Sequence, residues 1–272
     1  MSRYYANRNF AIGSTIVLLL LVMMIISLFW TPYDPNMIHD NHILESPTRE
    51  FLLGTDYLGR DILSRVMYAS QTVFIIGGGT LIISSIIGVS IGLISGYFGG
   101  WLDEILMRFV DAWMTIPGTI MVIVFVASFG RGMTQTLIAI SLTGFANFAK
   151  ITRSKVLSLK ESDHVLWARS VGVKRGRILV AHILPDIMPT LLVVGALRFS
   201  SAILTEAALS YLGLGIQPPD ASWGNILTRA QAYILSNWLY AFIPGLLITL
   251  MVIGFNLISD GLNKIYSEEG AY

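Results

Sequence analysis

Six long apolar runs constrain this chain more than any other feature of its sequence. They cover residues 10–30, 72–97, 105–129, 133–151, 190–212 and 238–260. A helix needs about 20 mostly apolar residues to cross a bilayer, and each run is close to that length. Inside lipid, the backbone polar groups of such a run must be satisfied by helical hydrogen bonds. We therefore predict an all-α integral membrane protein with six transmembrane helices.

The overall composition agrees with this fold class. The chain is 54% hydrophobic and 13% charged, whereas soluble globular proteins carry about 25% charged residues. The run at 10–30 follows Arg3 and Arg8, but it is too long for a signal peptide and no cleavage pattern follows it, so we predict an uncleaved first helix. No cysteine occurs, and His39 and His42 suit no standard ligand spacing, so no metal site is predicted.

The distribution of Lys and Arg predicts the orientation. Residues 150–182 hold eight of the chain's 18 basic residues against two acids, whereas residues 31–66 hold six acids against three arginines. Positive charge gathers on the cytoplasmic side of membrane proteins. We therefore place the loop between the fourth and fifth runs in the cytoplasm, and six crossings then put both termini there. Two segments, 31–71 and 213–237, are expected outside.

The basic loop has the punctuation of two short helices. Asp163 can cap a helix that Gly172 ends, and Pro185 can end a second helix over about 174–183. The first helix carries an apolar, aromatic knob at residues 165–167. Trp and Arg are favoured anchors at protein contacts, so we predict a compact protrusion that contacts a partner. Charge alone would fit a loop that only obeys the positive-inside rule.

This loop resembles the cytoplasmic loop of ATP-binding-cassette (ABC) importer permeases, whose pattern is E-A-A, three residues, G, nine residues, I-x-L-P. The chain matches it at Ala168, Gly172, Leu184 and Pro185, and departs at Leu166, Trp167 and His182. Four further segments resemble the C-type permease of the dipeptide, oligopeptide and nickel importer family. They are "LLGTDYLGRDILSRVMY" (52–68), "SGYFGGWLDEILMRFVD" (95–111), "EAALSYLGLGIQPPDASWGNIL" (206–227) and "FNLISDGL" (255–262).

The resemblance implies a type I ABC importer permease fold. Residues 1–71 would form the tail, first helix and external segment, and residues 72–272 the transmembrane domain with a coupling loop at about 152–189. The residues implied in coupling to an ATPase are Val165, Leu166, Trp167, Ala168, Arg169, Gly172, Lys174, Arg175, Leu184 and Pro185.

The same resemblance implies partners and a substrate class. The partners would be a second permease, two cytoplasmic ATPases and an external substrate-binding protein, with no nucleic acid. The cargo would be short peptides, or nickel and other metals carried as chelates. The phosphate-loop pattern G-x-x-x-x-G-K-[ST] is absent. We therefore expect a pore subunit that is not itself an enzyme and binds no cofactor, with ATP and Mg²⁺ used by the partner subunits.

Ionisable residues inside the runs are candidates for the translocation pathway, because such groups are costly in lipid. Arg198 and Glu206 lie eight residues apart, two helical turns or about 12 Å along one side. They could line the pathway or pair structurally. Asp111, near the inner end of the third run, could also contact substrate. Its alternative is a local ion-pair cluster, in which Arg108 can reach both Glu104 and Asp111.

The external segment at 52–68 offers a second candidate surface. Gly54 and Gly59 suit turns, and Asp56, Arg60 and Asp61 could form an external gate or a docking surface for the binding protein. The alternative is structural packing near the outer mouth, with ion pairs worth about 0–1 kcal/mol each.

Two other classes of protein fit parts of the sequence. A secondary transporter or channel would also be apolar with six crossings, but it would purify without an ATPase. A membrane-embedded hydrolase would need a nucleophile and a base at spanning depth, and none of the four histidines lies in a predicted crossing.

Overall fold

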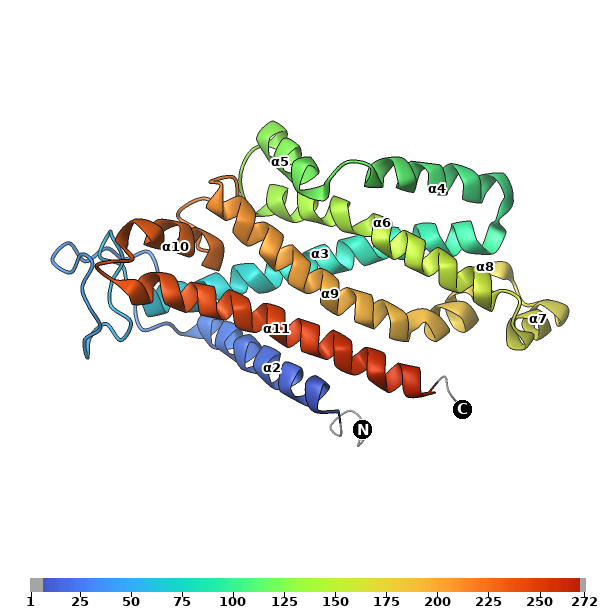
Figure 1. The fold of residues 1–272 in the computed structure, drawn as a ribbon, viewed down its shortest axis with the longest axis horizontal. Helices are drawn as coiled ribbons and strands as arrows, with labels where there is room; N and C mark the ends of the chain where they lie inside the picture. Colours follow the sequence, from blue (N-terminus) through green and yellow to red (C-terminus); the bar gives the residue numbers. More distant parts are fainter. Residues whose placement is uncertain (1–6, 270–272) are drawn as a thin grey trace.

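The structure is a computed structural model that describes residues 7–269 of the chain, with side chains as far as residue 266. Over this range all regular elements are helices, which confirms the predicted all-α class. The helices are α2 (Arg8–Phe29), α3 (Ile62–Phe98), α4 (Gly100–Met114), α5 (Gly118–Phe129), α6 (Met133–Leu159), α7 (Asp163–Ser170), α8 (Arg175–Ile178), α9 (Leu184–Tyr211), α10 (Trp223–Ala230) and α11 (Trp238–Glu269) (Figure 1). A π-helical turn (Leu179–Ile183) joins α8 to α9, and a 3₁₀ turn (Gln231–Tyr233) follows α10.

Four helical stretches are long and apolar enough to cross a membrane. They are α2, α3, the stretch from Arg175 to Tyr211, and α11 over Trp238–Tyr266. A fifth crossing exists if α4 and α5 count as one broken span, since they bend by 83° at their junction. A continuous helix over 105–129 was therefore a wrong prediction. Pro117 sits at the break, where it offers no N–H and pushes the preceding residue out of the helical region.

Small residues bring α3 and α6 into close contact. Gly88, Gly92 and Gly96 stand four residues apart on α3 and face α6. A Cβ atom at Gly88 would lie 2.3 Å from the carbonyl oxygen of Phe145, and one at Gly92 only 2.5 Å from Thr152 Cβ. Close backbone approach through small residues is a main source of helix association in lipid. Helices α3 and α6 are therefore packed in direct contact along this stretch.

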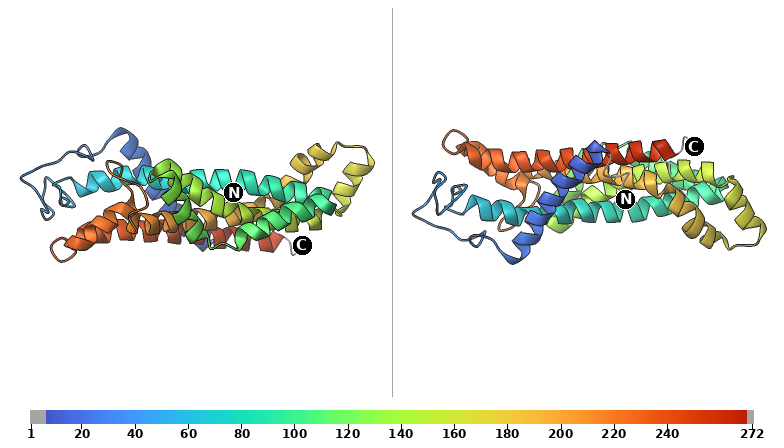
Figure 2. Two further views of the ribbon diagram at one scale, coloured as in Figure 1. Left: turned by 90° about the horizontal axis from the view of Figure 1, so that it is seen from above. Right: turned by 90° about the horizontal axis from the view of Figure 1, so that it is seen from below.

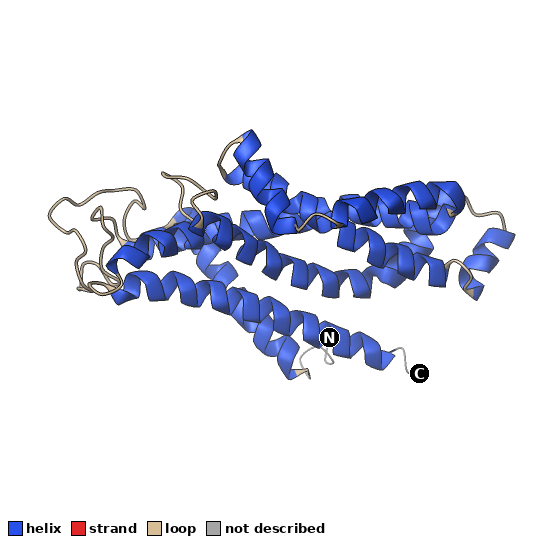
Figure 3. Cartoon of the chain, turned by 45° about the horizontal axis from the view of Figure 1, so that its top comes forward, coloured by secondary structure: helices blue, strands red, loops and turns tan. Residues whose placement is uncertain are grey.

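The molecule is elongated, with different structures at its two ends. The long loops at 30–61 and helix α10 gather at one end, and α7 projects from the other (Figures 1 and 3). Helices α2 and α11 lie side by side, with Gly13 against the backbone of Gly254, and α2 crosses the other long helices obliquely (Figure 2). The start of α2 and the end of α11 both point toward the α7 end (Figure 1).

A buried core holds the loop end together. Trp223 of α10 is fully buried, and its indole Nε1 donates a hydrogen bond of 3.0 Å to the carbonyl oxygen of Val66 in α3. Ile203 of α9 and Tyr240 of α11 belong to the same cluster. The segments at 52–68 and 206–227, far apart in sequence, are therefore packed against each other.

Candidate functional site

The protrusion at the α7 end begins and ends close to where the sequence predicted. Gly172 has φ +79°, and the amide of Val173 donates back to the carbonyl oxygen of Ala168 at 3.1 Å, so the predicted glycine end of α7 is confirmed. The N-cap is Ser162 and not Asp163, because Ser162 has the extended backbone of a cap and its carbonyl accepts from Leu166. Asp163 is the first helical residue instead.

The predicted apolar knob divides into two faces. Val165 and Ala168 are fully buried in a cluster with Tyr97 at the end of α3 and Val156 near the end of α6. Leu166 and Trp167 face outward, with 44% and 66% of their surface exposed. Residues three apart share one helix face, so one face anchors the protrusion to the bundle and the neighbouring face remains open.

The same segment carries unpaired positive charge. Four exposed basic residues lie within about ten residues of Trp167 in the sequence and take part in no ion pair within the described chain; they are Arg169, Lys174, Arg175 and Arg177. His164 Nε2 lies 2.9 Å from Asp186 Oδ2, which links α7 to the start of α9. The result is an exposed aromatic and aliphatic patch on a basic segment that is fixed to three long helices.

The second loop helix does not end at Pro185, which corrects that prediction. Helix continues from Arg175 to Tyr211, and Pro185 is the second residue of α9. The π-helical turn accounts for this continuity, because its wider hydrogen bonds, such as Leu184 N to Leu179 O, leave room for a residue that lacks an N–H. Leu184 is half-buried and Pro185 exposed. Helices α8 and α9 are therefore parts of one continuous helical stretch.

Arg198 and Glu206 lie in different surroundings. The guanidinium of Arg198 donates to the carbonyl oxygen of Ile140 and, at 2.7 Å, to Thr143 Oγ1 on α6, and it borders a cavity of about 360 Å³ beside the bend between α4 and α5. Glu206 is 2% exposed and accepts a hydrogen bond of 2.7 Å from Ser210 Oγ. Eight residues turn a helix by two turns plus about 80°, which separates the two side chains.

Asp111 forms an ion pair between helices. Its Oδ1 atom lies 2.6 Å from Lys150 Nζ on α6, so the predicted pair between Arg108 and Asp111 does not form. In the same region, Arg153 donates two hydrogen bonds of 2.6 Å to the carboxylate of Asp103. Asp111 and Arg153 border a further cavity of about 460 Å³. These contacts tie α4 to α6.

The predicted external residues lie at the opposite end of the molecule. Asp56 is fully buried and its Oδ2 atom accepts from Arg60 Nε at 2.7 Å, while Arg65 Nε lies 3.8 Å away. Asp61 caps α3, with Oδ2 2.8 Å from the amide of Ser64. Asp56 and Asp61 therefore stabilise the conformation of this loop from buried positions.

Glycine turns shape this loop as the sequence predicted. Gly54 and Gly59 both have φ +76°, and a Cβ atom at either would lie 2.3 Å from a carbonyl oxygen. The turns direct Tyr57 toward Tyr233, and the two rings stack with centroids 5.8 Å apart.

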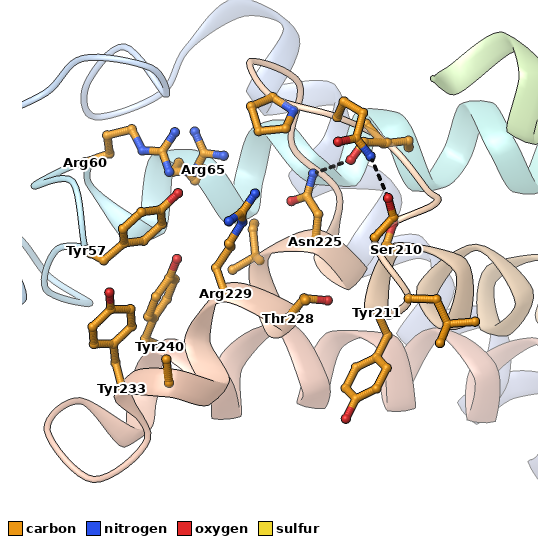
Figure 4. Close-up of a pocket in the computed structure, with 17 residues that line it drawn as sticks. Tyr57, Arg60, Arg65, Ser210, Tyr211, Asn225, Thr228, Arg229, Tyr233 and Tyr240 are labelled. Atoms are coloured by element: carbon orange, nitrogen blue, oxygen red, sulfur yellow. Dashed lines mark hydrogen bonds between the residues drawn. The ribbon is translucent and has the colours of Figure 1, made fainter. Parts of the chain in front are cut away.

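A pocket of about 490 Å³, here called the arginine pocket, opens between this loop, the end of α9 and α10 (Figure 4). Its polar and aromatic lining is Tyr57, Arg60, Arg65, Ser210, Tyr211, Gln217, Asn225, Thr228, Arg229, Tyr233 and Tyr240. Arg60 was a sequence candidate, but Arg229 and the tyrosines were not. Their only signal was a position within or near the two matching segments, which did not show that those segments meet.

Comparisons with known proteins agree on one family. The family model for "Binding-protein-dependent transport system inner membrane component" matches residues 88–268. Among curated proteins, the chain is 36% identical to the di/tripeptide transport system permease protein DppC of Pseudomonas aeruginosa over 265 residues, covering 95% of this chain and 88% of the relative. It is 36% identical to the oligopeptide transport system permease protein OppC of Bacillus subtilis over 262 residues, covering 96% and 86%.

The chain is also similar to a permease named for glutathione transport and to a solved ABC transporter structure. The glutathione transport system permease protein GsiD of Pectobacterium atrosepticum is 35% identical over 265 residues, covering 96% of this chain and 87% of the relative. Among solved structures, the MetNI methionine ABC transporter in an inward-facing conformation has a similar fold, with a TM-score of 0.55 and 17% identity over 73% of this chain and 94% of that chain.

Proposed function

Because this chain belongs to the family of inner membrane components of binding-protein-dependent transport systems, we propose that it forms one half of the translocation pathway of an ATP-driven peptide importer. It is a multi-pass inner membrane protein. Relatives named for di/tripeptide, oligopeptide and glutathione transport support short peptides as the cargo, in preference to nickel or metal chelates.

The proposed topology has six crossings with both termini in the cytoplasm. Helices α4 and α5 together make the third crossing, and α6 makes the fourth although it is more polar than the others. Contacts with α3, α4 and α9 cover part of α6, which lets it carry polar residues at depth. The gathering of basic residues in the α7 end supports a cytoplasmic position for that end.

The observation that carries the proposal is the exposed patch on the anchored protrusion. Leu166 and Trp167 are exposed, whereas Val165 and Ala168 fix the same helix to α3 and α6. A cytoplasmic ATPase that docks on the patch would push on these helices and, through the continuous α8–α9 stretch, on the fifth crossing. Rigid-body movement of a docked subunit is an established way to switch an assembly between two states.

The remaining partners follow from the same arrangement. A second permease would complete the pathway, and two ATPases would supply the energy of ATP hydrolysis with Mg²⁺. An external substrate-binding protein would deliver peptide at the end that carries α10.

A substitution at the patch tests this function. Trp167→Glu places a charge in the docking surface, so we expect transport-linked ATP hydrolysis to fall by tenfold or more, as for loss of an aromatic anchor worth about 2 kcal/mol. Trp167→Phe, which keeps an aromatic ring, should retain most of the activity. Both variants should remain in the membrane, since 66% of the Trp167 surface is exposed. Unchanged coupling in Trp167→Glu, or a chain that transports without any ATPase, would favour a secondary transporter or channel instead.

A further inference from the structure

The arginine pocket contains more positive charge than the chain balances. Arg60, Arg65 and Arg229 line it, and among the described residues no Asp or Glu does. Arg60 and Arg65 share one carboxylate beneath the pocket, that of Asp56. Arg229 is exposed and pairs with no carboxylate in the described part of the chain. Guanidinium groups stay charged, so the site has unmet capacity for an anion.

Two of the three arginines are held in fixed positions. Arg60 and Arg65 are 8% and 4% exposed. Arg65 Nη1 donates to the carbonyl oxygen of Pro35 at 3.0 Å and to Asn36 Oδ1 at 3.1 Å. Figure 4 shows Arg229 rising from α10 into the same space. A ligand would therefore meet prearranged donors together with one adjustable donor, which reduces the entropy lost on binding.

We propose that the arginine pocket binds the terminal carboxylate of a short peptide, an inference that rests on the peptide-import function proposed above. Guanidinium groups bind carboxylates through paired hydrogen bonds. Tyr57, Tyr233 and Tyr240 offer ring faces and hydroxyl groups to the rest of the ligand. The volume of about 490 Å³ lies within the range of about 300–1,000 Å³ that is usual for small-molecule sites.

The shape of the pocket favours a peptide over an acidic side chain of the external binding protein. Arg60 and Arg65 lie below the molecular surface, so a folded protein surface would reach Arg229 and little else. A peptide can enter the cavity and approach all three guanidinium groups. The pocket lies at the end opposite α7 (Figure 1), where the peptide would first meet this subunit.

Photolabelling tests the proposal. The chain, purified in nanodiscs with the subunits that accompany it but without the external binding protein, is exposed to a dipeptide that carries a diazirine side chain. Labelled positions are mapped by mass spectrometry for the dipeptide with a free carboxylate and for its C-terminal amide. We expect the acid to label residues 57–65 and 225–240, and the amide to label them about tenfold less, because a charge-assisted hydrogen bond is lost.

Arg229→Gln should lower labelling by the acid about tenfold, to the level of the amide. Arg131→Gln removes an exposed arginine outside the pocket and should label like the unmodified chain. Equal labelling by acid and amide, or no effect of Arg229→Gln, would overturn the proposal. So would an Arg229→Gln variant that loses the binding protein in a pull-down while labelling is unchanged, since the pocket would then be a docking site.

ATP hydrolysis measured on the same nanodiscs distinguishes failure of the pocket proposal from failure of the proposed import function. If Trp167→Glu uncouples ATP hydrolysis while Arg229→Gln is labelled by the dipeptide as strongly as the unmodified chain, only the pocket proposal fails. If no ATPase accompanies the chain, the import function itself fails.

Discussion

Asp56 and Glu104 each face an arginine four residues later, yet burial gives the two ion pairs different roles. The side chains of Asp56 and Arg60 are 0% and 9% exposed, whereas those of Glu104 and Arg108 are 63% and 78% exposed. Glu104 lies just before the apolar run at 105–129, at the membrane surface, where an exposed pair is screened by water and contributes about 0–1 kcal/mol. Removal of one partner from a buried pair leaves the other charge without compensation, at a cost of about 3–5 kcal/mol.

This contrast predicts the outcome of two matched substitutions. Asp56→Asn should lower the free energy of unfolding by about 3–5 kcal/mol, because Arg60 and Arg65 lose their carboxylate. Glu104→Gln should change it by about 0.5 kcal/mol or less. Thermal unfolding of the purified protein in detergent measures both changes. Equal shifts for the two variants would show that the loop at 52–68 does not depend on its buried ion pair.

At the scale of helices, the α3–α6 contact depends on the absence of side chains at three glycines. Gly92→Ala would place a Cβ atom 2.5 Å from Thr152 Cβ and 2.6 Å from the carbonyl oxygen of Ala149. The two helices must then separate and lose packing over several turns. We expect a lower yield of folded protein and a lower unfolding temperature.

Gly78→Ala, on the same helix, is the matched control. Apart from its own helical turn, no atom of the described residues lies within 4 Å of the position that its Cβ would take, and alanine favours helix by about 1 kcal/mol over glycine. It should be neutral or stabilising. If Gly92→Ala were equally well tolerated, the close α3–α6 contact would be contradicted.

Elements were predictable from sequence where the apolar pattern alone decides the structure. The long runs predicted α2, α3, α9 and α11 because lipid requires helices of about that length. Proline was a less certain guide. Pro117 marks a break of 83° and Pro185 does not interrupt its helix, while Pro189 and Pro244 lie inside helices. The outcome depends on whether neighbouring turns can rearrange their hydrogen bonds, and the local sequence does not report this.

A candidate site could be predicted from the sequence where one continuous segment forms it, and not where distant segments combine to form it. A short motif matched Gly172, and Trp167 was found beside it as an apolar knob although it departs from the motif, because the whole protrusion is built from one continuous segment. The arginine pocket combines Arg65 of α3 with Arg229 of α10. Hydrophobic periodicity does not report which distant segments meet, so Arg229 could be assigned only from the three-dimensional structure.

At the scale of the whole molecule, the account requires the α7 end to face the cytoplasm and the α10 end to face outward. The chain has no cysteine, so single-cysteine variants can report orientation without interference. In intact cells with a permeabilised outer barrier, Ile43→Cys should react with a membrane-impermeant maleimide, and Val171→Cys should react only after the inner membrane is opened. Both positions are well exposed, at 55% and 56%. The reverse labelling pattern would show that the chain has the opposite orientation in the membrane.

The central claim is that the exposed patch around Trp167 docks on a separate ATPase. A photoreactive phenylalanine at position 167, activated in native membranes, tests it most directly, with position 235 at the opposite end as the control. Leu235 is also strongly exposed. The account predicts a cross-linked product with an ATP-binding subunit from position 167 and none from position 235. Capture of no ATP-binding subunit from position 167, or its capture from position 235, would contradict the account.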